Sequence, residues 1–159
     1  MRFLSFALLA LFLLPGCDLI ESLEDSDPVA VPITSVRIAD IPLMPNRTTE
    51  WDDDGTGPDV FVEIQNTAGS NLGRSAIIPD VDLTQPLTVQ MPDGIETGSA
   101  DARLFVAVYD DDGGNIFVAE RLGDSRSFSV EELEGSGGSL VLLDSRSDNG
   151  RVATYEVIR

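Results

Sequence analysis

The chain lacks two residue types on which many active sites depend, histidine and lysine. Its 159 residues include no histidine, and all 10 of its basic residues are arginine. Without histidine the chain cannot form a Ser-His-Asp triad, a Cys-His pair or a histidine metal site. Without lysine it has no Schiff-base nucleophile and no phosphate-loop lysine. These absences exclude many classes of enzyme, and we expect a protein that is not an enzyme.

Cysteine and positive charge are also scarce. Cys17 is the only cysteine, which excludes an internal disulfide and a zinc–thiolate cluster. The 28 acidic residues outnumber the basic ones and give a formal net charge of −18. Because no basic stripe is present to neutralise phosphates, we expect no nucleic-acid partner. Hydrophobic residues make up 42% of the chain, close to the average of globular proteins, so the sequence predicts one folded domain.

The N-terminus carries a short hydrophobic segment. After Arg2, residues 3–14 are apolar apart from one serine. This length is typical of a signal-peptide core and is shorter than the run of about 20 residues that spans a bilayer. The sequence Leu-Pro-Gly-Cys follows and ends at Cys17, which resembles the lipobox of bacterial lipoproteins. An ordinary secretory signal with an incidental cysteine is the alternative.

The lipobox resemblance implies a signal peptide over residues 1–16 and cleavage before Cys17. It also implies that Cys17 carries acyl chains, palmitate among them, and becomes the mature N-terminus. The protein would then be a membrane-anchored lipoprotein of the bacterial cell envelope, facing the periplasm or the exterior. Residues 17–30 are short and acidic and are expected to be a tether, and residues 31–159 are expected to form one domain.

From residue 31 onward, short strand-like runs alternate with segments rich in the turn formers Gly, Asp, Asn and Pro. Only residues 130–134 read as a helical turn. Eight or nine short strands at this spacing predict an all-β fold, an eight-stranded antiparallel β-sandwich. The expected strands are 33–40, 60–65, 75–78, 87–91, 104–109, 116–122, 127–130, 139–143 and 152–158.

Two acidic runs are the most informative feature for function. Residues 51–59 read WDDDGTGPD and residues 109–115 read YDDDGGN, each beside a predicted strand. Like charges about 4 Å apart repel by about 1 kcal/mol in water and by about 4 kcal/mol when partly shielded. Calcium would relieve this repulsion, since it takes roughly six to eight oxygen ligands. An EF-hand is excluded because alignment on either glycine puts Ala119 or Phe61 at the twelfth position, which must be a ligand.

The spacing of the two runs resembles the calcium loops of the C2 domain, the membrane-binding module of protein kinase C and synaptotagmin. Residues 53–62, DDGTGPDVFV, are similar to the family's first loop, and residues 104–112, LFVAVYDDD, to the strand and start of its third loop. The resemblance covers about residues 31–159 and implies a C2-like β-sandwich. It further implies calcium ligands at one end of the sandwich, namely Asp53, Asp59, Asp110, Asp112 and Glu120.

The leading hypothesis is therefore a lipid-anchored binding module that contacts a lipid or protein partner in a calcium-dependent way. Residues 85–91 carry no charge, so the basic strand that binds phosphoinositides in some C2 domains is absent, and attraction to anionic lipid would need calcium as a bridge. Two alternatives stay open. One is a metal-free structural envelope lipoprotein with solvated acidic turns. The other is a small carbohydrate-processing enzyme, since paired carboxylates can hydrolyse glycosides.

Overall fold

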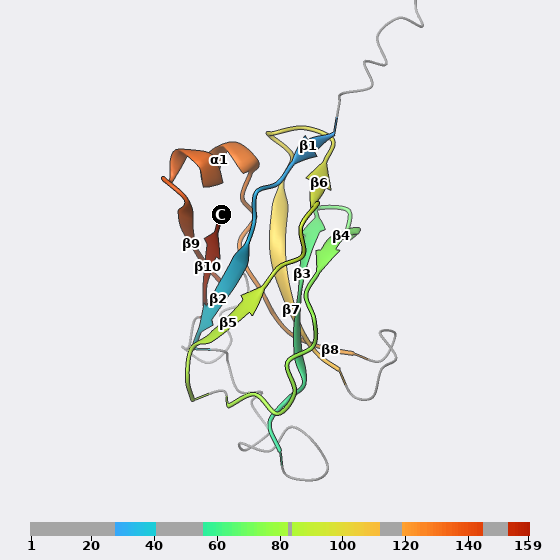
Figure 1. Ribbon diagram of the computed structural model, residues 1–159, viewed down its shortest axis with the longest axis vertical. Helices are drawn as coiled ribbons and strands as arrows, with labels where there is room; N and C mark the ends of the chain where they lie inside the picture. The colour runs from blue at the N-terminus through green and yellow to red at the C-terminus, as the bar shows by residue number, and fades with distance from the viewer. Residues whose placement is uncertain (1–27, 41–55, 83, 112–118, 145–152) are drawn as a thin grey trace, which may run out of the picture.

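Two antiparallel sheets face each other in the computed structural model, which describes residues 28–40, 56–82, 84–111, 119–144 and 153–159 (Figure 1). The predicted eight-stranded antiparallel β-sandwich is confirmed, since each sheet has four strands. The elements of the described residues are β1 (Val29–Ala30), β2 (Ser35–Ala39), β3 (Val60–Asn66), β4 (Asn71–Arg74), β5 (Leu87–Gln90), β6 (Glu96–Thr97), β7 (Leu104–Asp110), β8 (Glu120–Asp124), α1 (Val130–Gly135), β9 (Ser139–Leu143) and β10 (Thr154–Ile158).

The strand order of the first sheet is β5-β2-β10-β9, and that of the second is β4-β3-β7-β8. β1 and β6 form a separate two-stranded ribbon. Figure 1 shows this ribbon at the end of the sandwich opposite to the one where β3 begins and β7 ends. The described chain therefore starts at one end of the sandwich and has its acidic strand ends at the other.

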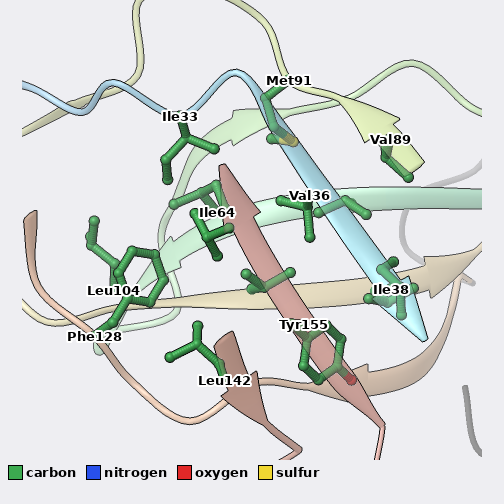
Figure 2. Close-up of a cluster of buried hydrophobic side chains, with 14 of the residues drawn as sticks. Ile33, Val36, Ile38, Ile64, Val89, Met91, Leu104, Phe128, Leu142 and Tyr155 are labelled. Carbon is green, nitrogen blue, oxygen red and sulfur yellow. The ribbon is translucent and has the colours of Figure 1, made fainter. Parts of the chain in front are cut away.

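Side chains that alternate along the strands fill the space between the sheets, because successive residues of a strand point to opposite faces. In β2, Val36 and Ile38 are fully buried, and their register partners in the adjacent strand β10, Val157 and Tyr155, lie beside them on the same inward face of the sheet (Figure 2). Full burial of such a side chain stabilises the fold by about 1.5–3 kcal/mol. The largest fully buried side chains are Tyr155, Phe61, Phe128, Ile38, Ile64, Ile95, Leu104, Leu133, Val36, Val60, Val62 and Val89.

The outer face of the second sheet is also covered, which explains the nearly continuous apolar runs of β3 and β7. Phe61 of β3 stacks on Tyr109 of β7 with ring centroids 5.1 Å apart. The guanidinium of Arg74, on β4, lies 3.6 Å above the Phe61 ring. Arg121 of β8 lies near the Tyr109 ring, 5.6 Å from its centroid. Phe61 is consequently only 2% exposed although it points away from the core.

Two predicted strands are wrong. The expected strand 75–78 is displaced by β4, because the Ser75 hydroxyl accepts from the Val62 N–H at 3.0 Å and only a single bridge remains at Ile78. The expected strand 127–130 is absent, because Phe128 makes one isolated bridge with Leu104 and the next residue begins a helix cap. The ribbon of β1 and β6 was not predicted, since two-residue strands leave no pattern of alternation.

The other predicted elements are confirmed with shifted ends. The strand expected at 116–122 is β8, which begins at Glu120. Residues 116–118 of the expected strand lie outside the described residues. The helical turn expected at 130–134 is α1. Ser129 caps it, since its hydroxyl accepts from the Glu132 N–H at 3.2 Å and the Glu132 carboxylate accepts from the Ser129 N–H at 2.8 Å. This reciprocal pair of bonds is a capping box.

Removal of the cap hydroxyl is expected to destabilise the domain modestly. Ser129→Ala should lower the free energy of unfolding by about 1 kcal/mol, the usual cost of losing a serine N-cap. Urea denaturation measures the change. Ser127→Ala, an exposed serine two residues earlier, is the control and should alter the free energy of unfolding by less than about 0.5 kcal/mol. Equal effects of the two substitutions would contradict the cap assignment.

Candidate functional site at the acidic end of the sandwich

Three neighbouring strands bring acidic residues to one end of the second sheet. In the pairing register, Val60 of β3 lies opposite Asp110 of β7, and Asp110 lies opposite Glu120 of β8. Asp59 immediately precedes β3, and Asp111 immediately follows β7. Asp59, Asp110 and Glu120, three of the five predicted calcium ligands, therefore lie at the same sheet end. We call this region the acidic end, made of Asp59, Asp110, Asp111 and Glu120.

Asp110 is the most buried member of the acidic end. It continues the inward-facing series of Val106 and Val108 along β7, and its side chain is 0% exposed. Its Oδ1 accepts from the Asp59 N–H at 2.9 Å, and the Asp111 N–H donates to the Asp59 carbonyl at 2.9 Å. These two bonds fasten the beginning of β3 to the end of β7.

A third segment joins the acidic end and was missed in the sequence. Asp59 Oδ1 accepts from the Asp80 N–H at 3.0 Å. Asp80 adopts a left-handed backbone with φ of 52°, a conformation that aspartate tolerates better than most residues. Ile78 forms a bridge with Val60 through two backbone hydrogen bonds of 2.8 and 2.9 Å. The sequence signal that could have found Asp80 is the Pro-Asp pair at 79–80, a common turn former.

Gly57, within the first acidic run, has a structural role. A Cβ at this position would lie 2.2 Å from the carbonyl oxygen of Val81. The Val81 N–H in turn donates to the carbonyl of Pro58 at 3.0 Å. Only glycine allows the two backbones to approach this closely. The glycine of this run therefore positions Asp59 beside the 78–82 segment.

The predicted ligand set is only partly within the described residues. Asp53 and Asp112 lie outside them, as does the predicted lipidation site Cys17. Among the residues that the structure describes, no group of three or more His, Cys, Asp or Glu side chains is placed to hold a metal ion. The described residues thus place three of the five predicted ligands at one end, and two of these carboxylates accept backbone N–H bonds.

A second buried polar cluster links the two sheets and was not predicted. The Tyr155 hydroxyl of β10 donates to Asp144 Oδ2 at 3.1 Å. On β8, Arg121 forms an ion pair with Asp124, and Asp124 and Asp144 are each 7% exposed. Burial, followed by the negative charge of Asp144, raises the pKa of the Tyr155 phenol above its ordinary value. The raised pKa favours the protonated phenol, which is the form that donates the hydrogen bond to Asp144.

Gly123 makes room for this cluster. It lies opposite Val108 on β8, and a Cβ there would be 2.4 Å from the Tyr155 hydroxyl and 3.0 Å from Asp144 Oδ2. Every second residue of β9 points inward, and Asp144 continues the series of Leu140 and Leu142. This alternation is the sequence signal that could have predicted the burial of Asp144.

The described part of the chain contains no helix that is long and apolar enough to cross a membrane. The sequence matches no protein-family model and no curated protein. Solved structures do resemble its fold. The structure described as BON1-C2B superposes with a TM-score of 0.50 at 13% identity, over 78% of this chain and 85% of that one.

A second match is a structure of two C2 domains of extended synaptotagmin 2. Its TM-score is 0.41 at 14% identity, over 99% of this chain and 47% of that one. The fold assignment rests on the first match, whose identity is too low to indicate more than the fold. The described domain is a β-sandwich similar in fold to a C2 domain.

Proposed function

We propose that the protein is a lipid-anchored binding module of the bacterial envelope whose acidic end binds calcium. The anchor is Cys17, and the module is the β-sandwich that follows it. The observation that supports calcium binding is the convergence of Asp59, Asp110 and Glu120 on one sheet end, fixed by the registers of β3, β7 and β8. Asp53 and Asp112, close to these strand ends in sequence, would complete the ligand set.

Carboxylate oxygens are the ligands that calcium prefers, and loops supply them without strict geometry. The bonds from Asp59 and Asp80 N–H groups to the carboxylates of Asp110 and Asp59 are compatible with ligation, since a carboxylate has two oxygens and about four acceptor sites. Bound calcium would then offer its remaining coordination positions to an acidic partner, either an anionic lipid headgroup or a protein carboxylate.

One observation favours a second candidate, a metal-free structural lipoprotein. Asp110 and Asp59 each accept a hydrogen bond from a backbone N–H that lies at the junction of separate segments. Such bonds to ionised groups stabilise a fold by about 1.5–3 kcal/mol. The two carboxylates would then serve to hold these segments together, and the other aspartates of the two acidic runs would lie in solvated turns.

A calcium titration of thermal stability separates the two candidates. An extracellular site commonly has a Kd of about 10⁻⁴ to 10⁻³ M. At about 10 mM calcium and a Kd of about 10⁻⁴ M, binding to the folded state alone adds about 2.7 kcal/mol of stability. We expect calcium to raise the Tm by several degrees beyond sodium chloride of equal ionic strength, and magnesium to raise it less.

Two matched double variants test whether the calcium-dependent rise in Tm comes from the acidic end. Glu120→Gln combined with Asp112→Asn should remove the calcium increment of the Tm. The control combines Glu96→Gln with Asp93→Asn, two exposed acids away from the acidic end, and should keep the increment while changing the net charge by the same amount. Equal shifts with sodium, calcium and magnesium would mean that salt merely screens a strongly acidic surface, and would favour the metal-free candidate.

A further inference from the structure

A groove of about 620 Å³ lies between α1 and β9, the edge strand of the first sheet. Figure 1 shows α1 and β9 next to each other at the margin of the sandwich. The volume of the groove falls within the range of about 300–1,000 Å³ typical of ligand-binding clefts. Its walls are Arg126 and Ser127, the α1 residues Glu132 and Gly135 with Ser136, and residues 140–143.

The backbone of β9 is open toward this groove at Val141. The Arg159 N–H donates to the Gly138 carbonyl at 3.1 Å, and the Asp144 N–H donates to the Ala153 carbonyl at 2.9 Å. Because antiparallel ladders alternate, the even-numbered residues of β9 bond to β10, and the N–H and C=O of Val141 point away from β10. Neither group bonds to any residue that the structure describes. An extended segment in the groove can therefore pair with both of them.

The edge of β9 is closed at its Leu143 end. The Arg126 N–H donates to the Leu143 carbonyl at 2.8 Å, and Ser125 forms a bridge with Asp144. The chain then leaves β9, because Phe128 forms its bridge with the second sheet. A strand added in the groove cannot continue past this closed end, so its last residue must lie beside Arg126.

The charge at the closed end favours a carboxylate over an amine. Arg126 is exposed, and its guanidinium forms no ion pair with any residue in the described part of the chain. Glu132 also lines the groove, but its carboxylate is paired with Arg103 at 2.8 Å. The Debye length of about 8 Å at physiological salt screens the more distant acidic surface. The terminus that fits beside Arg126 is therefore a C-terminal carboxylate.

Backbone pairing favours a peptide over a fatty acid, which also combines an apolar chain with a carboxylate. The stretch that β9 contributes to the groove is uncharged and apolar, and the Val141 side chain is 62% exposed. An acyl chain would cover the N–H and C=O of Val141 without bonding to them, which is unfavourable. A peptide strand supplies a partner for each group.

We propose that the groove between α1 and β9 binds the C-terminal segment of another protein, an extended apolar peptide whose terminal carboxylate meets Arg126. The segment runs parallel to β9, since both strands then end at the same side, and it pairs with the N–H and C=O of Val141. It adds a strand to the first sheet, and mixed sheets of this kind are common. The site shares no residue with the acidic end and requires neither calcium nor the lipid anchor.

The probe is a fluorescein-labelled heptapeptide that alternates valine with serine and ends in a free carboxylate. Fluorescence anisotropy should give saturable binding with a Kd below about 100 μM. The same peptide with an amidated C-terminus should bind at least about tenfold more weakly, because it has no charge to meet the Arg126 guanidinium.

Arg126→Gln tests the closed end of the groove. It should weaken binding of the free-carboxylate peptide at least about tenfold and leave the Kd of the amidated peptide within about twofold. Arg159→Gln is the matched control, because it removes the same charge near the other end of β9, where the Arg159 Nε would lie 3.6 Å from a Cβ at Gly138. It should leave both Kd values within about twofold. Both arginines are exposed, so neither variant should unfold the domain.

Amide exchange on the unaltered chain tests the backbone pairing. The Val141 N–H should become protected when the free-carboxylate peptide is added. Four results would overturn the inference: no saturation by this peptide, equal binding of the amidated peptide, equal weakening by the two arginine variants, or binding without protection of the Val141 N–H. Octanoate that binds in an Arg126-dependent way, while the peptide does not, would instead assign the groove to an acyl chain.

Discussion

Gly123→Ala is expected to lower the free energy of unfolding by about 3 kcal/mol, the upper end of the usual cost of overpacking. The added Cβ would lie 2.4 Å from the Tyr155 hydroxyl. Tyr155 is 1% exposed and is held by its neighbours in the core, so its ring cannot move aside without disturbing both sheets (Figure 2). Chemical denaturation of the two forms measures the difference.

A double-mutant cycle makes this prediction specific. Tyr155→Phe removes the oxygen that the alanine Cβ would meet, so Gly123→Ala should cost less in the Tyr155→Phe background than in the original chain. The coupling should reach about 1 kcal/mol or more, as is usual for residues in contact. Gly98→Ala is the control, because a Cβ at Gly98 would meet nothing within 4 Å. Strict additivity of Gly123→Ala and Tyr155→Phe would show that the steric account is wrong.

Cys17→Ala is expected to release the protein from membranes entirely. Each methylene of an acyl chain that enters the bilayer contributes about 0.8 kcal/mol, so several chains on one residue hold a protein firmly, and their loss leaves only weak contacts. Fractionation of cells that express the original chain or the variant measures the effect. Incorporation of labelled palmitate should occur in the original chain and be absent from the variant.

Asp18→Ala provides a matched control for the anchor, since it alters the neighbouring residue and retains the cysteine. It should leave both palmitate labelling and membrane association in place. If Cys17→Ala still sedimented with membranes and neither form incorporated fatty acid, the lipobox interpretation would have to be abandoned. The arrangement of the acidic end would be unaffected by that outcome.

The sequence predicted the sandwich well where strands are buried on alternating or on both faces. β7 is the clearest case, since LFVAVYD is apolar throughout except for its last residue and the structure covers both of its faces. Strand prediction was weaker where a side chain takes the place of a backbone partner in the hydrogen-bond ladder between strands. The Ser75 hydroxyl takes the place of a backbone acceptor, and such substitution leaves no periodic pattern in the sequence.

The residues of the candidate site that lie at the ends of strands could be predicted from the sequence. Asp59, Asp110 and Glu120 flank predicted strands, and the antiparallel register of β3, β7 and β8 brings them together. Asp80 and Asp144 were missed because their roles depend on contacts between segments far apart in the chain, 21 residues for Asp59 with Asp80 and 11 for Asp144 with Tyr155. The Pro-Asp pair at 79–80 and the alternation along β9 mark the two positions, but they do not identify these partners.

The placement of the β1–β6 ribbon has a consequence for the orientation of an anchored protein. The ribbon holds the start of the described chain at the end of the sandwich opposite the acidic end (Figure 1). From Cys17 to Val29 the chain can extend at most about 40 Å, given about 3.5 Å for each residue. For a protein held by Cys17, the point of attachment to the sandwich would lie at the ribbon end, away from the acidic end. Calcium at that end would then serve to join the anchoring membrane to an opposing surface, such as a facing leaflet or a neighbouring protein layer.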